Sequence, residues 1–358
     1  MALYSEELNS MKTIIFFWIG IIFFLYSSTS SAEVVEILKP ELSGAYFEAA
    51  KLREQSIKHD PDKVIESISS VISKSSNPIE KFNLIFWELS FLYAENEKYD
   101  RCLQILEQGQ DEGLFYPLQT GNSIWPKYLN QLKDLDRFNS FIEENNLLKQ
   151  KAQENANFEY FVQLPQDYKS GTSYPLLIVL HGGFGSHYGS SEKWHSAKLD
   201  SQYIVAYLQG VQYRGSFLRS FMSSDFTNIV EAYDQIKQKY KVDTSRVILG
   251  GVSAGGMRSI TIALNELIPT AGLLLAFPVK PEELEDHKLQ TAAETGLRAA
   301  VLCGENDWAI KQQKELGVIF DKNNIPNRFV VFSGKGHEYP DNFSGELDIS
   351  IDFISKVE

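Results

Sequence analysis

Cysteine is scarce in this chain of 358 residues, occurring only at Cys102 and Cys303. Two cysteines cannot provide the dense disulfide framework of a small secreted domain, and neither has the Cys/His spacing of a zinc site. Cys303 lies in an apolar, strand-like run, and Cys102 lies in a helical segment far away in the sequence. We therefore expect two separate buried thiols rather than a disulfide, and no metal site.

Basic residues are also in deficit, since 34 Lys and Arg face 47 Asp and Glu, for a formal net charge of -13. Nucleic-acid binding needs clustered Lys and Arg side chains against the phosphates, and no such cluster or motif occurs. We therefore expect no nucleic-acid partner. The composition, 43% apolar and 23% charged, is that of a globular protein, and the length suffices for two hydrophobic cores.

The apolar run Ile14–Tyr26 has 13 residues, fewer than the roughly 20 that a membrane-spanning helix needs. Lys12 precedes the run, and small residues follow it up to Ala32. This order predicts a secretory signal peptide over residues 1–32, with Met11 as an alternative start. We expect an exported protein, periplasmic, extracellular or at the cell surface, that meets the membrane only transiently. An uncleaved anchor is the alternative.

No convincing strand-like alternation occurs between residues 33 and 150, where apolar residues recur at spacings of three and four. This pattern predicts a small all-α domain. The stretch ELSFLYAENEKYDRCLQIL, residues 88–106, resembles one tetratricopeptide-like helical hairpin. The packing positions of that motif are occupied by Phe86, Leu89, Ser90, Tyr93, Tyr99, Cys102 and Leu106. An ordinary helical hairpin is the alternative, and a protein partner could bind a domain of either kind.

From residue 157 to residue 358 the pattern changes, because short apolar runs alternate with helical segments. The predicted strands are 174–180, 202–208, 246–250, 272–277, 299–303 and 328–332, and the predicted helices are 227–240, 255–267, 310–322 and 348–356. Such alternation predicts a mainly parallel sheet with helices on both faces.

The pentapeptide Gly251-Val252-Ser253-Ala254-Gly255 lies between a predicted strand and a predicted helix. A G-x-S-x-G pattern in that position is typical of a nucleophile elbow, a turn so sharp that its flanking positions must be glycine. The Ser253 hydroxyl would project above the carboxyl ends of the strands, close to a helix N-terminus that favours negative charge. Ser253 is therefore the candidate nucleophile.

A serine hydroxyl is a weak nucleophile unless a base lies beside it. His337 follows the predicted strand 328–332, and small residues precede it in Gly334-Lys335-Gly336. Asp307 follows the strand 299–303 and would hold the imidazole of His337 in the required tautomer. Glu305 is the competing acid. We favour Asp307 because one more step along the loop carries it over the edge of the sheet.

The segment His181-Gly182-Gly183-Phe184-Gly185 directly follows the predicted strand 174–180. Glycine lets a backbone approach a ligand closely, and a tetrahedral intermediate needs backbone N–H groups aimed at its oxyanion. We assign one N–H donor to Gly183 or Phe184 and the other to Ala254. His181 is interpreted as structural rather than as the base, because it stands at the wrong end of the sheet order.

Four segments together resemble the α/β-hydrolase superfamily, and within it the secreted feruloyl esterase, polyhydroxybutyrate depolymerase and phospholipase/carboxylesterase-like group. They are FVQLPQDYKSGTSYPLLIVLHGG, VDTSRVILGGVSAGG, GENDW and GKGH. The resemblance covers about 157–358 and not the helical region. It implies a catalytic triad, no cofactor, and an ester substrate that is a small molecule or is linked to a polymer. A peptidase or acyltransferase with the same triad, or a non-catalytic interaction protein, are the alternatives.

The segment between Phe277 and Ala299 is short and polar, so we expect no bulky lid there. The loops at 186–194 and 214–222 are longer and could shape a pocket. Their aromatic residues, and one beside Asp307, are candidate pocket walls. These are Trp194, Tyr213, Phe217, Phe221 and Trp308.

Overall fold

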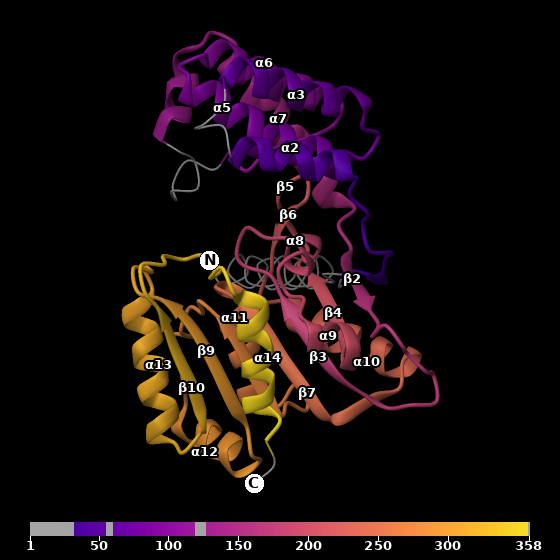
Figure 1. The fold of residues 1–358 in the computed structure, drawn as a ribbon, viewed down its shortest axis with the longest axis vertical. Coiled ribbons are helices and arrows are strands. Elements are labelled where there is room, and N and C mark those ends of the chain that lie inside the picture. Colours follow the sequence, from indigo (N-terminus) through magenta and orange to yellow (C-terminus); the bar gives the residue numbers. More distant parts are fainter. Residues whose placement is uncertain (1–31, 55–59, 119–126, 357–358) are drawn as a thin grey trace, which may run out of the picture.

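The computed structural model in Figure 1 describes residues 32–54, 60–118 and 127–356. The predicted signal peptide, apart from residue 32, lies outside the described residues. Among the helices that are described, none has the length and hydropathy required to cross a membrane.

The described residues form an eight-stranded sheet with the order β1-β2-β4-β3-β7-β8-β9-β10. Within this sheet the β2–β4 pair is antiparallel, and the other neighbouring pairs are parallel. The strands are β1 (Val34–Glu36), β2 (Phe158–Gln163), β3 (Tyr174–Leu180), β4 (Ile204–Gln209), β7 (Val242–Val252), β8 (Gly272–Ala276), β9 (Arg298–Gly304) and β10 (Asn327–Phe332). The predicted mainly parallel sheet is thereby confirmed.

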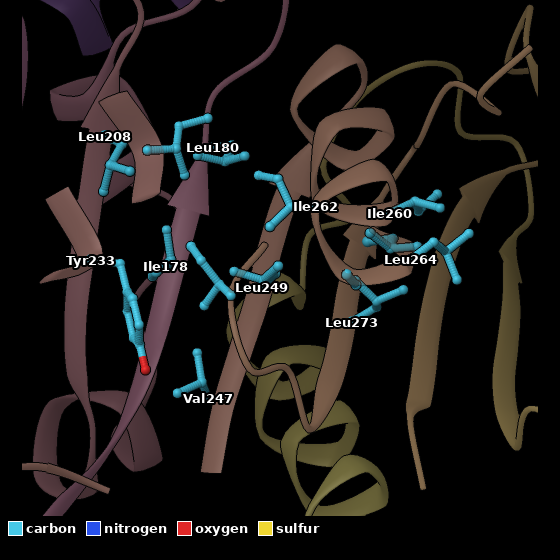
Figure 2. Close-up of a cluster of buried hydrophobic side chains, with 14 of the residues drawn as sticks. Ile178, Leu180, Leu208, Tyr233, Val247, Leu249, Ile260, Ile262, Leu264 and Leu273 are labelled. Atoms are coloured by element: carbon cyan, nitrogen blue, oxygen red, sulfur yellow. The ribbon is translucent and has the colours of Figure 1, made fainter. Parts of the chain in front are cut away.

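Helices cover both faces of this sheet and build a hydrophobic core on each. The first core receives side chains from α10 (Asp225–Lys239), α11 (Ala254–Leu264), α12 (Asp286–Glu294) and α13 (Ile310–Lys322). The second receives them from α8 (His187–Ser191), α9 (Ala197–Gln202) and α14 (Phe343–Ile354). Figure 2 shows Ile178, Leu249 and Ile260 in the first core, all fully buried. Each such side chain stabilises the fold by about 1.5–3 kcal/mol.

A separate group of helices lies above the sheet in Figure 1. They are α2 (Gly44–Glu54), α3 (Pro61–Lys74), α4 (Pro78–Asn83), the π-helix η2 (Leu84–Leu89), α5 (Ser90–Glu95), α6 (Tyr99–Asp111), the 3-10 helix η3 (Lys127–Asp134) and α7 (Phe138–Glu154). Aromatic side chains such as Phe82, Phe86 and Tyr116 fill their core. The predicted hairpin is present as α5 and α6, and its tetratricopeptide character stays a prediction.

The prediction of an all-α region over residues 33–150 was wrong at the N-terminal end of that range. Residues 34–36 form β1, which pairs in parallel with β2, and the Val34 side chain is buried. A strand of three residues is too short for its alternation to be recognised. The expectation for the two cysteines is confirmed, because Cys102 and Cys303 are both free and buried.

The helical region is joined to the sheet domain through a hairpin of β5 (Gln212–Gly215) and β6 (Leu218–Ser220). Two hydrogen bonds join Phe115 to Ser216. The Ser216 N–H donates to the Phe115 carbonyl oxygen, 2.9 Å, and the Phe115 N–H donates to the Ser216 hydroxyl oxygen, 2.7 Å. The rings of Phe82 and Phe217 pack edge to face at 5.7 Å. These contacts position the helices relative to the carboxyl ends of the strands.

Candidate active site

Ser253 occupies the sharp turn between β7 and α11, with φ 55° and ψ -118°. A non-glycine residue at positive φ is strained, and such strain is concentrated at functional sites. The turn is held by the bond from the Ser253 N–H to the Ala276 carbonyl oxygen, 3.0 Å. A Cβ atom at Gly255 would collide with the carbonyl oxygen of Leu180, so this position requires glycine. The geometry is that of the predicted nucleophile elbow.

His337 and Asp307 lie in direct contact. The Nδ1 atom of His337 is 2.9 Å from Oδ2 and 3.0 Å from Oδ1 of Asp307. The Asp307 carboxylate also accepts bonds from the Ala309 N–H, 2.8 Å, and from the Gln313 side-chain amide, 2.9 Å. Its side chain has no solvent exposure. Four hydrogen-bonding contacts therefore fix the acid in an orientation that holds Nδ1 of the imidazole and leaves Nε2 free for chemistry.

Glu305 has a different role from Asp307. Its carboxylate accepts hydrogen bonds from the Ser333 hydroxyl and the Gly334 N–H, each at 2.8 Å. The bond from Gly334 lowers the pKa of Glu305. Glu305 therefore stabilises the turn that precedes His337 and does not contact the imidazole. The two loops approach so closely that a Cβ atom at Gly304 would collide with the carbonyl oxygen of Gly336.

A cavity of about 950 Å³ opens beside Ser253 and His337, and its walls are rich in aromatic side chains. Besides these two residues it is lined by Trp87, His181, Gly182, Gly183, Phe184, Gly185, Ser186, Tyr188, Gly189, Ser190, Lys193, Leu218, Val252, Ala254, Val279, Trp308 and Tyr339. In the described part of the chain no hydrogen bond joins Ser253 to His337. Catalytic hydrogen bonds are often long before a substrate binds, so the pair remains a candidate nucleophile and base.

The three predicted oxyanion donors lie together on this cavity. Gly183, Phe184 and Ala254 all line it, and a Cβ atom at Gly183 would be in ordinary contact with the Ala254 methyl group, at 3.9 Å. Among the described residues, no protein group accepts a hydrogen bond from the N–H of any of the three. Ala254 is also the first residue of α11, where N–H groups have no partner inside the helix. Three backbone N–H groups beside the cavity, without a protein acceptor in the described part of the chain, could stabilise the negative charge that develops on a substrate oxygen.

His181 is part of the framework beneath the cavity. Its Nε2 accepts a bond from the Gly210 N–H, 3.2 Å, and its Nδ1 lies 2.7 Å from the Gly182 carbonyl oxygen. Only the neutral imidazole with its proton on Nδ1 satisfies both contacts. The ring stacks on Phe221 at 4.4 Å. His181 is thus structural, as predicted, and burial lowers its pKa to about 4.

The buried His181 predicts a loss of stability in acid. The ordinary pKa of 6.5 is lowered to about 4 in the folded chain. Between pH 6.5 and pH 4, the imidazole is therefore protonated in the unfolded chain and neutral in the folded chain. The free energy of unfolding should therefore fall by about 2 kcal/mol between pH 7 and pH 5 on account of His181 alone. Urea unfolding at pH 7 and at pH 5 measures this change in the free energy of unfolding. In His181→Asn the decrease should be smaller by that amount, whereas His195→Asn, at an exposed site, should retain it. An equal decrease in both variants would contradict the assignment.

Among the five predicted pocket walls, only Trp308 lines the cavity. Trp308 is 67% exposed, and the centroid of its ring lies 5.3 Å from that of the His337 ring. Trp194 is fully buried and donates to the Tyr339 hydroxyl, 3.2 Å. The other three stabilise the framework instead. Tyr213 bonds to Arg219, Phe217 packs on the helical region, and Phe221 stacks on His181.

Three aromatic wall residues were not predicted individually, namely Trp87, Tyr188 and Tyr339. Tyr188 lies in the loop 186–194, which was expected to shape a pocket. Tyr339 lies two residues after His337 and could have been suspected from that position. Trp87 carries no such signal, because it belongs to the helical region and more than 160 residues separate it from Ser253 in the sequence.

The mainly parallel sheet, the helices on both of its faces and the elbow directly after β7 define the α/β-hydrolase fold. No known family profile matches the chain, and no curated protein matches its sequence. Among the described residues, no group of three or more His, Cys, Asp or Glu side chains is placed to hold a metal ion.

Several solved structures are similar to this one. An uncharacterized protein from Bacillus cereus ATCC 10987 is 18% identical with a TM-score of 0.49, over 87% of this chain and 98% of that one. A ferulic acid esterase from Anaeromyces mucronatus is 16% identical with a TM-score of 0.42, over 55% and 84%. A Bacillus cereus carboxylesterase is 18% identical with a TM-score of 0.41, over 57% and 97%. At such low identity and TM-score, the function of this chain has to be argued from its own residues.

Proposed function

We propose that this protein is a serine hydrolase that cleaves carboxylic esters through an acyl-enzyme on Ser253. The observation that carries the proposal is the arrangement of three groups, two of which line one cavity while the third contacts one of them. Ser253 is held at positive φ in the elbow, His337 lines the same cavity, and the buried Asp307 carboxylate contacts Nδ1 of that histidine. This set is the one that nucleophilic acyl transfer requires.

In the acylation step the Ser253 hydroxyl oxygen attacks the ester carbonyl carbon, and its proton passes to Nε2 of His337. The carbonyl oxygen becomes an oxyanion, which accepts hydrogen bonds from the N–H of Ala254 and from that of Gly183 or Phe184. Collapse of this intermediate breaks the bond to the alcohol oxygen. The proton on Nε2 then passes to the departing alcoholate, so the alcohol leaves neutral.

Water completes the cycle by the same route. His337 removes a proton from a water molecule, whose oxygen attacks the acyl carbon bound to Ser253. The second tetrahedral intermediate releases the Ser253 oxygen, which regains its proton from His337, and the carboxylic acid departs. Asp307 stays ionised throughout and stabilises the imidazolium in both steps.

Export is part of the proposal, because residues 1–32 carry the order of a signal peptide. The mature chain would then begin near Glu33, which N-terminal sequencing of exported protein tests. An exported esterase meets esters that are free small molecules or that are linked to polymers.

A fluorophosphonate probe tests the nucleophile directly, because it phosphonylates an activated serine and spares ordinary hydroxyl groups. We expect one covalent adduct per chain, located by peptide mass spectrometry on Ser253. Denaturing the protein before the reaction should abolish labelling, since activation depends on the folded site. A folded chain that remains unlabelled would refute the proposed function.

A further inference from the structure

The helical region contributes a side chain to the cavity that contains Ser253. Trp87 lies in η2 and lines this cavity together with residues of the sheet domain. The other large apolar side chains of η2, those of Leu84, Ile85, Phe86 and Leu89, are buried, whereas Trp87 is only half-buried. One residue of this turn is therefore directed toward the space that a substrate would occupy.

The local backbone explains how Trp87 comes to face this way. The helical stretch from α4 to α5 is interrupted by the π-helix η2, where the Ser90 N–H bonds to the Ile85 carbonyl oxygen five residues earlier. A π-helical turn changes which side chains share a face, and such turns are frequent at functional sites. The neighbouring rings hold Trp87 in place, with centroid distances of 4.6 Å to Phe86 and 5.7 Å to Phe91.

A second contact ties the helical region to the cavity wall. The Tyr188 hydroxyl donates to the side-chain oxygen of Asn83, 3.1 Å, and both residues are buried. The Asn83 amide in turn contacts the Tyr46 hydroxyl at 3.3 Å. Because Tyr188 itself lines the cavity, the helical region both supplies one wall residue and orients another. Figure 1 shows these helices lying over the end of the sheet domain that carries α8 and the β5–β6 hairpin.

We propose that Trp87 is a specificity-determining residue and that the helical region selects esters with a large apolar group. This inference rests on the proposed function. A volume of about 950 Å³ greatly exceeds what an acetyl group needs, and it lies within the range of sites that enclose drug-sized ligands. An apolar substituent that extends from the scissile ester to the indole gains burial that a small ester cannot gain. Among the described residues that line the cavity, Lys193 is the one fully charged side chain, so most of the surface suits apolar groups.

The test compares Trp87→Ala with the wild type on two pairs of substrates. The acyl pair is p-nitrophenyl acetate and p-nitrophenyl octanoate, and the alcohol pair is methyl acetate and 1-naphthyl acetate. Each effect is the ratio of kcat/KM in the variant to that in the wild type, so differences in leaving-group reactivity cancel. We expect the large member of one pair to lose about tenfold more than the small member, mainly through KM. The pair that responds identifies which side of the ester reaches Trp87.

Phe47→Ala is the matched control, because Phe47 is an exposed aromatic residue of the same helical region that does not line the cavity. It should alter neither pair selectively. Trp87→Phe, which retains a smaller ring, should shift selectivity in the same direction by less, and it replaces Trp87→Ala if circular dichroism shows that variant to be unfolded. Equal losses on small and large esters, in a variant that the fluorophosphonate probe still labels at Ser253, would overturn this inference alone. A wild type without labelling would overturn the proposed function beneath it.

Discussion

Ser253→Ala is expected to abolish the hydrolysis of p-nitrophenyl acetate while the protein stays folded. Removing the nucleophile of a serine triad lowers turnover by on the order of 10⁶, as it does in subtilisin. Alanine lacks the hydroxyl oxygen that attacks the ester, yet it changes little in the packing of the elbow. Initial rates measured at matched protein concentration, with circular dichroism to verify folding, provide the test.

Two further variants sharpen this result. Ser245→Ala, in the exposed first half of the same strand β7, should keep full activity. Ser253→Gly should be as inactive as Ser253→Ala but more stable by about 1–2 kcal/mol, because glycine adopts positive φ without strain. Near-normal turnover in folded Ser253→Ala would remove Ser253 from the mechanism. Glycine also lowers the free energy of unfolding by about 0.4–1 kcal/mol relative to alanine, because it makes the unfolded chain more flexible. A Ser253→Gly variant less stable than Ser253→Ala by that amount would show that the elbow stores no strain.

Asp307→Asn is expected to lower turnover by about 10⁴, the size of the effect that the same change has in the triad of trypsin. The amide is isosteric with the carboxylate and preserves the fold around it. However, Nδ1 of His337 lies 3.0 and 2.9 Å from the two carboxylate oxygens, so the NH₂ group would face Nδ1 from either position. That contact favours the tautomer with its proton on Nε2, and such a ring cannot accept the proton of Ser253. Steady-state kinetics on p-nitrophenyl acetate measure the loss.

Glu305→Gln is the matched control for this change, because it also replaces a carboxylate by an amide, two residues away in the same loop. Glu305 bonds to Ser333 and Gly334 and not to the imidazole. We expect turnover to fall by less than about tenfold, since only the turn before His337 is weakened. A severe loss in Glu305→Gln together with a mild one in Asp307→Asn would require a triad with Glu305 as its acid.

The central strands and the elbow follow from local sequence. The run YPLLIVL at 174–180 coincides with β3, and the helix predicted at 310–322 coincides with α13. Uniformly apolar runs of this length belong in the middle of a parallel sheet. The glycines around Ser253 are equally local signals, because a sharp turn from strand to helix has few alternatives to glycine.

Weakly patterned segments were harder to predict. Strand β1 has only three residues, and it forms because β2 offers it an unpaired edge. Likewise, β5 and β6 are short and their side chains are partly polar, so their pairing and their contact with the helical region left no periodic signal. Pairing partners that lie more than 100 residues apart, as Val34 and Phe158 do, are chosen by the assembled sheet.

Within the site, the choice between Asp307 and Glu305 also depended partly on local sequence and partly on tertiary structure. Glu305 and Asp307 follow the end of β9 by one and three residues, so sequence spacing placed an acid in this loop and favoured Asp307 only by reach. In the folded chain, the close approach of Gly304 to Gly336 turns Glu305 toward Ser333 and Asp307 toward His337. Only the tertiary structure places Trp87 in the wall of the cavity, because a contact between two regions depends on how those regions dock. Local sequence encodes turns, strands and helices, whereas docking is determined by shape and polar complementarity between surfaces that are distant in the chain.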